Sequence, residues 1–177
     1  MDKDMALATA VTTKIEDGNI KAAIRILSSD DSLAPDCEET VNALRRRHPA
    51  AAPDRTANPD PHSFPSLAVS EKEVSEAIRS FPAGSAGGPD RFRPQHLRDL
   101  TSDPTFGPPL IAAITGFVNI LLDGKCPQPI APVLFGGNLT ALTKKTGGIR
   151  PIAVGYTWRR LVAKCAMTRG LEMLGDT

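Results

Sequence analysis

The stretch "NLTALTKKTGGIRPIAV" (residues 138–154) has the pattern of two short strands joined by a tight turn. Apolar and β-branched residues lie on both sides of Lys145-Thr146-Gly147-Gly148, and glycine supplies the positive φ that tight hairpins require. Pro151 removes one backbone donor from the second strand, which suits an edge position. The sequence therefore predicts a small antiparallel hairpin here.

The region before the hairpin begins with residues that favour helix. Residues 2–48 are predicted to be helical with a break at residues 28–31, and one helical face carries Ile20, Ala23, Ile24 and Leu27. A second helix is expected over about residues 35–47, with Pro35 in its first turn. Arg45, Arg46 and Arg47 then lie at its negative C-terminal end, which accounts for this triplet without a nucleic-acid partner.

Residues 49–65 contain five prolines and few apolar side chains, which is typical of a linker. This segment divides the expected domains into a helical N-terminal extension (1–48), the Pro-rich linker (49–65) and a second domain (66–177). The second domain starts with Ser70-x-x-Glu73, the signature of a capping box that begins a helix.

Further helices are expected in the second domain on both sides of the hairpin. The first should end before Pro82, and others should cover about residues 94–100 and 109–122 and the segment after residue 156. The expected buried faces comprise Leu110, Ile114, Phe117 and Leu121 in one helix, and Trp158, Leu161, Val162 and Cys165 in the last. The predicted fold class is α+β, mostly helical with a small antiparallel hairpin.

A formal net charge of +1 conceals an uneven distribution of charge. Residues 124–171 contain eight lysines and arginines and no acidic residue, whereas the preceding residues carry 13 basic and 18 acidic side chains. Such a one-sided block favours an anionic partner, most simply phosphate groups. A solvated basic face without a partner remains the alternative.

The hairpin offers a specific place for a phosphate. Residues that flank a tight turn lie within about 5 Å across the strands, so Lys144 or Lys145 can converge with Arg150 on one anion. A guanidinium fork and an ammonium group together suit a triphosphate. The same lysines also fit an ordinary edge hairpin that avoids aggregation.

A glycine-rich loop, "GSAGGPD" (84–90), is a second candidate site. It lacks the Gly-Lys-Ser/Thr of a P-loop and the glycine order of a dinucleotide fold. Its glycines permit close approach to a phosphodiester backbone, although a plain connecting loop is the favoured explanation on the residues alone.

Several classes of function find no support. The cysteines and histidines show neither disulfide nor metal-ligand spacing; they are Cys37, Cys126, Cys165, His48, His62 and His96. No signal peptide or membrane span is predicted. No paired carboxylates suited to a two-metal site and no nucleophile–base signature are evident.

Two stretches, "FPAGSAGGPDRFRPQHL" (81–97) and "LTALTKKTGGIRPIAVGYTWRRLVAKC" (139–165), resemble the fingers region of reverse transcriptases from non-LTR retrotransposons of the site-specific, ribosomal-DNA type. "DGNIKAAIRILSSDDSLAP" (17–35) resembles the segment upstream of the polymerase in these elements. The resemblance covers nearly the whole chain, in family order.

The resemblance implies roles for individual residues. The glycine loop, here Gly87, Gly88, Pro89 and Asp90, would lie near template and primer, although Arg91 stands where the family often has glycine. Arg150 would contact the triphosphate of the incoming nucleotide, with Lys144 or Lys145 beside it. The helix cations Arg159, Arg160 and Lys164 would face the nucleic-acid backbone.

The resemblance also implies what lies outside these residues. The family's metal-binding aspartate and aromatic-x-Asp-Asp turn are not found in residues 1–177, so we expect a fragment without catalytic or metal residues; the intact polymerase would use Mg²⁺ and dNTPs. The expected partners are RNA template, DNA primer and dNTP, together with a missing palm segment or a second copy that covers an exposed apolar face of the hairpin or last helix. The implied location is intracellular and nuclear. The alternatives are a non-enzymatic RNA- or DNA-binding module and a decayed gene fragment without function.

Overall fold

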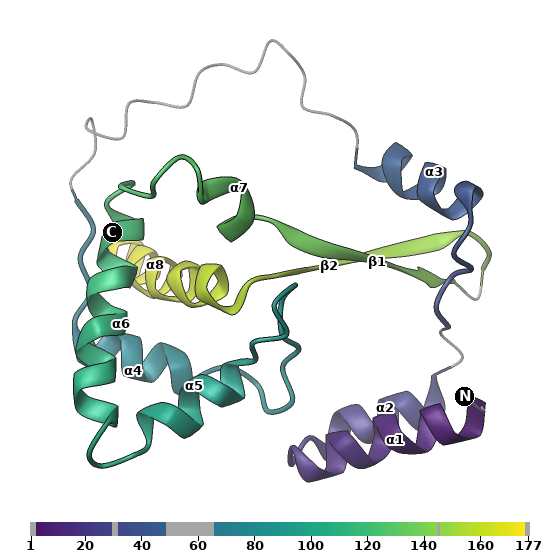
Figure 1. Cartoon of the computed structure of the whole chain (residues 1–177), viewed down its shortest axis with the longest axis horizontal. Helices are drawn as coiled ribbons and strands as arrows, with labels where there is room; N and C mark the ends of the chain where they lie inside the picture. Colours follow the sequence, from purple (N-terminus) through teal and green to yellow (C-terminus); the bar gives the residue numbers. More distant parts are fainter. Residues whose placement is uncertain (1–2, 30–31, 49–65, 145, 176–177) are drawn as a thin grey trace. The chain divides into compact units, whose positions relative to one another are not determined.

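The computed structural model describes residues 3–29, 32–48, 66–144 and 146–175. It is mostly helical with one two-stranded antiparallel sheet, which confirms the predicted α+β class (Figure 1). The elements in chain order are α1 (Lys3–Glu16), α2 (Ile20–Ser28), α3 (Glu38–Arg47), α4 (Glu71–Arg79), α5 (Pro94–Thr101), α6 (Gly107–Leu122), α7 (Ala131–Leu134), β1 (Gly137–Thr143), β2 (Ile149–Gly155) and α8 (Thr157–Gly175).

The chain divides into two compact units, and the Pro-rich linker predicted at residues 49–65 lies outside the described residues. The first unit groups residues 1–55 and 82–84 with the outer hairpin, residues 139–153. The second unit groups residues 56–81, 85–138 and 154–177. The hairpin joins the N-terminal residues because Ser32 and Ala34 pair with β1, through hydrogen bonds from Thr143 N to Ser32 O and from Ala34 N to Ala141 O, both 2.9 Å.

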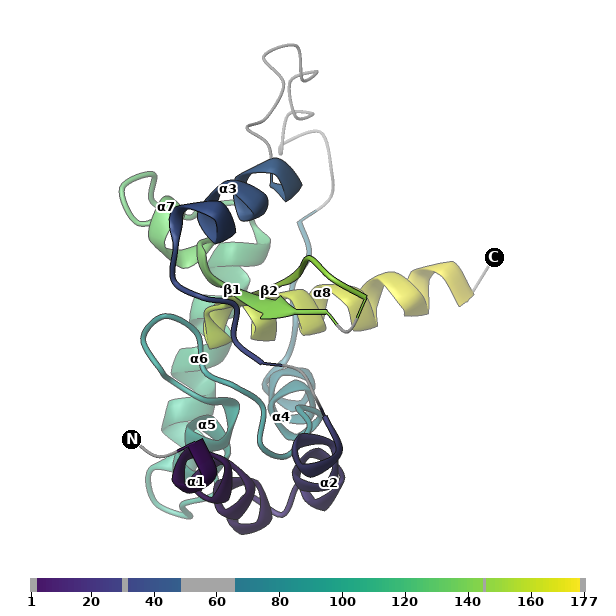
Figure 2. The same ribbon diagram turned by 90° about the vertical axis from the view of Figure 1, so that its right-hand side faces the viewer.

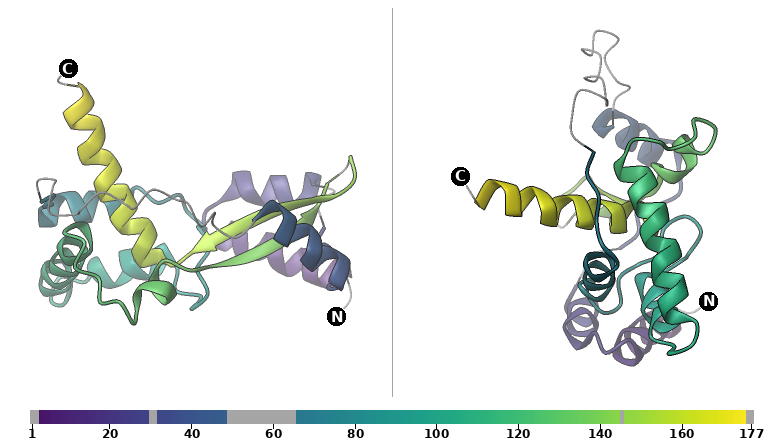
Figure 3. Two further views of the ribbon diagram at one scale, coloured as in Figure 1. Left: turned by 90° about the horizontal axis from the view of Figure 1, so that it is seen from above. Right: turned by 90° about the vertical axis from the view of Figure 1, so that its left-hand side faces the viewer.

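The second unit has a hydrophobic core built by α4, α5, α6 and α8. The right-hand view of Figure 3 shows α8 crossing α6. Leu161 of α8 is fully buried among side chains from the other helices, including Val74, Ile78 and Val118. The predicted inner face of α8 is confirmed, since Cys165 is also buried and Trp158 and Val162 pack on the core.

Helix α4 begins with the predicted capping box. The Ser70 side chain accepts from the Glu73 amide, and the Glu73 carboxylate accepts from the Ser70 amide at 2.8 Å. Hydrogen bonds from Ser70 and then the nearby Arg169 guanidinium, which lies 2.8 Å from the carboxylate, lower the pKa of Glu73. These interactions tie the start of α4 to α8.

Replacing Glu73 with glutamine should therefore lower stability in a pH-dependent way. The pKa of Glu73 is lower in the folded chain than its ordinary value of 4.5, so its charge stabilises the fold above that pH, and the benefit disappears as pH falls through the folded pKa. Urea unfolding should give the variant a lower free energy of unfolding than the original chain at pH 7, and this difference should disappear at acidic pH. Glu76→Gln, exposed on the same helix, serves as the control, and a pH-independent difference would contradict the assignment.

Helix α6 faces the core with a different side from the one that the sequence predicted. Ile114 and Leu121 are buried as expected, but Leu110 and Phe117 are only half-buried. The buried positions also include Ile111, Thr115 and Val118. The Asn119 side chain fixes this orientation, because its amide group accepts from Val69 N at 2.9 Å and donates to Val69 O at 3.0 Å.

In the first unit, α1 and α2 pack side by side (Figure 2). The predicted helical face of α2 exists, but only Ala23 is buried on it. Ile20, Ile24 and Leu27 are each more than half exposed. Asn19 caps α2 by accepting from Ala22 N at 3.1 Å, and its side chain also donates to the Ala83 carbonyl.

Helix α3 starts later than the sequence suggests. Pro35 lies outside the helix, which begins at Glu38 with Cys37 as the N-cap residue. The reason is that the backbone of Ser32 to Ala34 is extended alongside β1, where Leu33 forms an antiparallel bridge with Leu142. A proline that looked suited to a first helical turn therefore ends a strand-like segment.

The C-terminal half of α8 carries an exposed apolar stripe, which agrees with the exposed face predicted for the last helix. Met167, Leu171 and Leu174 are each about two-thirds exposed or more. Among the helices that the structure describes, none combines the length and the hydropathy that crossing a membrane requires.

Candidate nucleotide and nucleic-acid sites

The hairpin turn has the hydrogen bonds of a G1 β-bulge. Gly147 N donates to Lys144 O and Lys144 N donates to Gly148 O, both at 3.0 Å. Gly147 and Gly148 have φ of 86° and 78°, so both need the left-handed region that glycine adopts without strain. The prediction that glycine enables this turn is confirmed.

The bulge also fixes which hairpin residues share a face. Thr143 lies opposite Ile149 and Leu142 lies opposite Arg150, so Arg150 and Ile149 point to opposite faces of the sheet. Lys144 follows Leu142 by two residues and lies on the Arg150 face. Lys144 is half-buried and Arg150 is exposed, whereas Lys145 lies outside the described residues. The hairpin thus brings one lysine and the predicted arginine to one face.

The glycine loop packs tightly against the start of α8. A Cβ atom on Gly88 would lie 2.7 Å from Tyr156 Cα, and one on Gly87 would lie 2.6 Å from the carbonyl carbon of Arg91. The Asp90 carboxylate accepts from Phe92 N at 3.1 Å, and Arg91 N donates to Gly88 O at 2.9 Å. The glycines are therefore required by packing within the protein.

Arg91 adopts a positive φ of 59°, the only non-glycine residue among the described ones to do so. This explains why a glycine suits the position after Asp90. Replacing Arg91 with glycine should remove about 1–2 kcal/mol of left-handed strain and add about 0.5–1 kcal/mol of chain entropy cost. Urea unfolding followed by Trp158 fluorescence should show that the free energy of unfolding rises by about 0.5–1 kcal/mol. The control variant Arg91→Ala should show no such rise.

The α8 cations make contacts within the second unit. Arg160 donates to the Ala86 carbonyl at 2.6 Å and lies 5.3 Å from the Phe81 ring centroid. Partial burial lowers the pKa of its guanidinium. Lys164 Nζ lies 3.0 Å from Ser80 Oγ and 4.9 Å from the same ring centroid, and Arg159 donates to Phe135 O at 3.0 Å. These three residues position loops as well as carrying charge.

Other residues at this junction were missed by sequence reasoning. Thr157 is fully buried and its hydroxyl donates to the Phe92 carbonyl. The Phe92 and Trp158 rings stack at 5.5 Å. The sequence offered little indication of this contact, because no local pattern relates an aromatic residue in a loop to another one 66 residues later. Together with Gly88 and Arg160, they join the glycine loop to α8.

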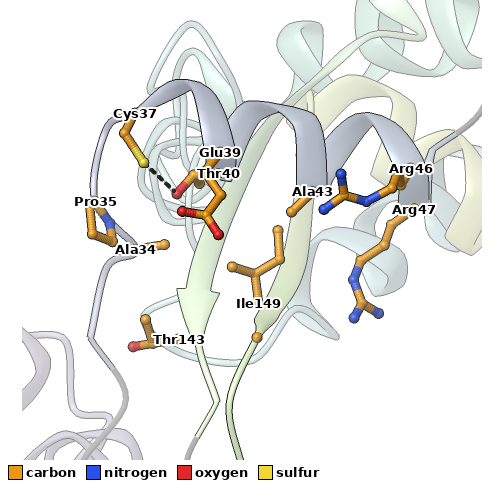
Figure 4. A pocket seen from close by; sticks show the side chains of 11 residues that line it. Ala34, Pro35, Cys37, Glu39, Thr40, Ala43, Arg46, Arg47, Thr143 and Ile149 are labelled. Carbon is orange, nitrogen blue, oxygen red and sulfur yellow. Dashed lines mark hydrogen bonds between the residues drawn. The ribbon is translucent and has the colours of Figure 1, made fainter.

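A second missed feature is a pocket of about 490 Å³ in the first unit, between α3 and the hairpin (Figure 4). Arg46 and Arg47, which sequence reasoning assigned to the helix dipole, line it together with Thr143, Gly148 and Ile149. The pocket therefore brings two further cations to the hairpin, from a helix about 100 residues earlier in the chain.

The magnesium ions implied by the resemblance find no ligand set in the described part of the chain, where no three histidine, cysteine or acidic side chains converge. Comparison with known proteins finds no matching family model, no matching curated protein and no matching solved structure.

Proposed function

We propose that these residues form the fingers region of a retroelement RNA-directed DNA polymerase, contacting template-primer and the incoming dNTP without performing the chemistry alone. The observation that carries this proposal is the packing of the glycine loop onto the start of α8. Gly88 abuts Tyr156 and Arg160 bonds Ala86, so two motifs of the family resemblance meet although about 70 residues separate them. If the two stretches resembled the family only by chance, there would be no reason to expect them to lie in contact.

In this proposal the hairpin binds the triphosphate. Arg150 provides a fork of donors for phosphate oxygens, and Lys144 on the same face adds a point charge. The preorganised bulge holds the lysine backbone in place, so little ordering is needed on binding. Lys145 stays a candidate for the same role.

In the second unit, the glycine loop and the α8 cations contact the nucleic-acid backbone. Arg160 and Lys164 each make internal bonds, yet a guanidinium and an ammonium have more donors than these bonds use. The absence of acidic residues from 124 to 171 leaves their positive potential uncancelled within this stretch of sequence.

The test is binding of a fluorescein-labelled RNA–DNA template-primer, measured by anisotropy across a salt series with and without dNTP. Affinity should fall steeply with salt. The double variant Lys144→Ala, Arg150→Ala should raise by about 10-fold or more the dNTP concentration needed to change template-primer affinity, from loss of charge-assisted hydrogen bonds. Lys21→Ala, Arg79→Ala removes the same charge elsewhere and should leave that concentration unchanged.

Two results would contradict the proposal. Equal losses in both double variants would mean that net charge, and not the hairpin, binds the nucleotide. Primer extension by these 177 residues with Mg²⁺ would show that the chemistry does not need further residues. Salt-dependent binding of nucleic acid that added dNTP does not change would favour the non-enzymatic binding module instead.

A further inference from the structure

The pocket under α3 is built by three segments of the first unit. Ala34 and Pro35 close one side, the hairpin residues Thr143 and Ile149 form the floor, and one face of α3 forms the roof (Figure 4). Its volume of about 490 Å³ lies within the range of small-molecule sites, about 300–1,000 Å³. Ile149 points into this pocket, so the pocket occupies the hairpin face opposite Arg150.

Helix α3 lies over this floor without sealing it. None of its residues is buried, although Thr40 and Ala43 line the pocket and are half-buried. An amphipathic helix on a sheet normally buries an apolar stripe, and here the space that such side chains would fill is open. The middle of the pocket is apolar, with Ile149 and Ala43 around it.

The two ends of the pocket carry opposite charges. Arg46 and Arg47 line one end; neither forms an ion pair with any residue in the described ranges. Glu39 lines the other end, seven residues earlier on α3. Seven residues at 1.5 Å rise separate these groups by about 10 Å along the helix axis. Arg45, in contrast, does not line the pocket and bonds Asn42 at 3.3 Å.

A thiol lies beside the acidic end. Cys37 Sγ is 3.4 Å from Thr40 Oγ1, and this side-chain hydrogen bond, followed by one to the Thr40 backbone, lowers the pKa of Cys37. The Thr143 hydroxyl bonds Ser32 O at 3.0 Å. The acidic end thus offers carboxylate oxygens as its main acceptors, and the basic end offers guanidinium donors.

We propose that this pocket binds a guanine nucleotide, with its phosphate between Arg46 and Arg47 and its base edge on Glu39. Two arginine forks suit phosphate oxygens. An ionised carboxylate only accepts hydrogen bonds, and guanine presents two adjacent donors, N1–H and the 2-amino group, whereas adenine presents an acceptor beside its amino group. The apolar middle covers the faces of the sugar and base. The site goes beyond the dNTP contact proposed above, since it uses the other face of the hairpin.

The chemistry is shared by free GMP and by a 5′-phosphorylated guanosine in single-stranded RNA, so both are probes. The full chain is titrated with GMP, AMP and guanosine by calorimetry, and then with the trinucleotides pGUU and pAUU. GMP should bind at least about 10-fold more tightly than AMP or guanosine, because each lacks one charge-assisted contact. Equal affinity for GMP and pGUU indicates a free nucleotide, and tighter binding of pGUU indicates a strand.

Matched variants on α3 locate the site. Arg46→Ala, Arg47→Ala should weaken GMP binding by about 10-fold or more, while Arg45→Ala should change it less than about 2-fold. Glu39→Gln should reduce GMP to the affinity of AMP, and Glu38→Gln should not. Arg150→Ala should leave GMP binding intact, which separates this site from the dNTP contact.

Three results would overturn the proposal. The first is that GMP does not bind at millimolar concentration, and the second is that GMP and AMP bind the original chain with equal affinity. The third is that Arg45→Ala weakens GMP binding as much as the double variant Arg46→Ala, Arg47→Ala does. Inorganic phosphate provides a check that needs no variant, since it should displace GMP competitively. Circular dichroism of each variant confirms that the exposed substitutions leave the helices folded.

Discussion

Replacing Leu161 with alanine should lower the free energy of unfolding of the second unit by about 3 kcal/mol. Leu161 is fully buried at the centre of the cluster that joins α8 to α4 and α6. Removing a buried leucine loses its transfer free energy and leaves a cavity that the neighbours fill only in part, which costs about 2–5 kcal/mol. A domain stabilised by about 5–15 kcal/mol loses a large share of its stability by this change.

Urea unfolding followed by tryptophan fluorescence measures this loss in the correct unit. Trp158 is the chain's only tryptophan and it stacks on Phe92 at 5.5 Å, next to the core. Leu171→Ala is the matched control, because Leu171 lies on the same helix but is 65% exposed, and it should change stability by less than about 0.5 kcal/mol. Similar losses in the two variants would show that Leu161 is not central to the core.

Local sequence signals predicted the elements whose causes are local. The Ser70–Glu73 capping box and the Gly147–Gly148 turn each depend on residues within four positions of one another, and both exist as expected. The last helix also buries its predicted face, with Leu161 and Cys165 in the core.

Contacts between distant residues account for what the sequence could not predict. The side of α6 that faces the core depends on Asn119 and Val69, which are 50 positions apart. The start of α3 depends on the pairing of Ser32 with Thr143, 111 positions away. Since α6 is apolar around most of its circumference, periodicity alone could not choose between its faces.

The same limit applies to the candidate sites. The sequence indicated that Lys144 or Lys145 pairs with Arg150 because a hairpin brings residues near its turn together. The three arginines of α3 look equivalent in sequence, and only the fold divides Arg45 from the two that line the pocket. The resemblance implied that Arg160 faces the nucleic-acid backbone, and its bond to Ala86 gives it a structural role as well.

Replacing Gly88 with alanine should destabilise the second unit by about 1–3 kcal/mol, the range for overpacking a site that cannot collapse. The added methyl group would lie 2.7 Å from Tyr156 Cα and 2.9 Å from both Gly155 O and Tyr156 N. All three are backbone atoms at the start of α8, so no flexible side chain can move aside. The loop must shift instead, and the bond from Arg160 to Ala86 should weaken with it.

Gly116→Ala makes the same chemical change as Gly88→Ala, but it should raise stability where Gly88→Ala lowers it. Gly116 lies inside α6 on an exposed surface, with nothing within 4 Å of an added Cβ, so alanine should stabilise the helix by about 0.5–1 kcal/mol. The two variants, compared by urea unfolding with Trp158 as the probe, should move the midpoint in opposite directions. If both variants moved the midpoint in the same direction, the loop would not pack against α8. The observation that supports the fingers proposal would then be lost. A destabilised Gly88→Ala chain that also binds template-primer more weakly would connect this contact to function.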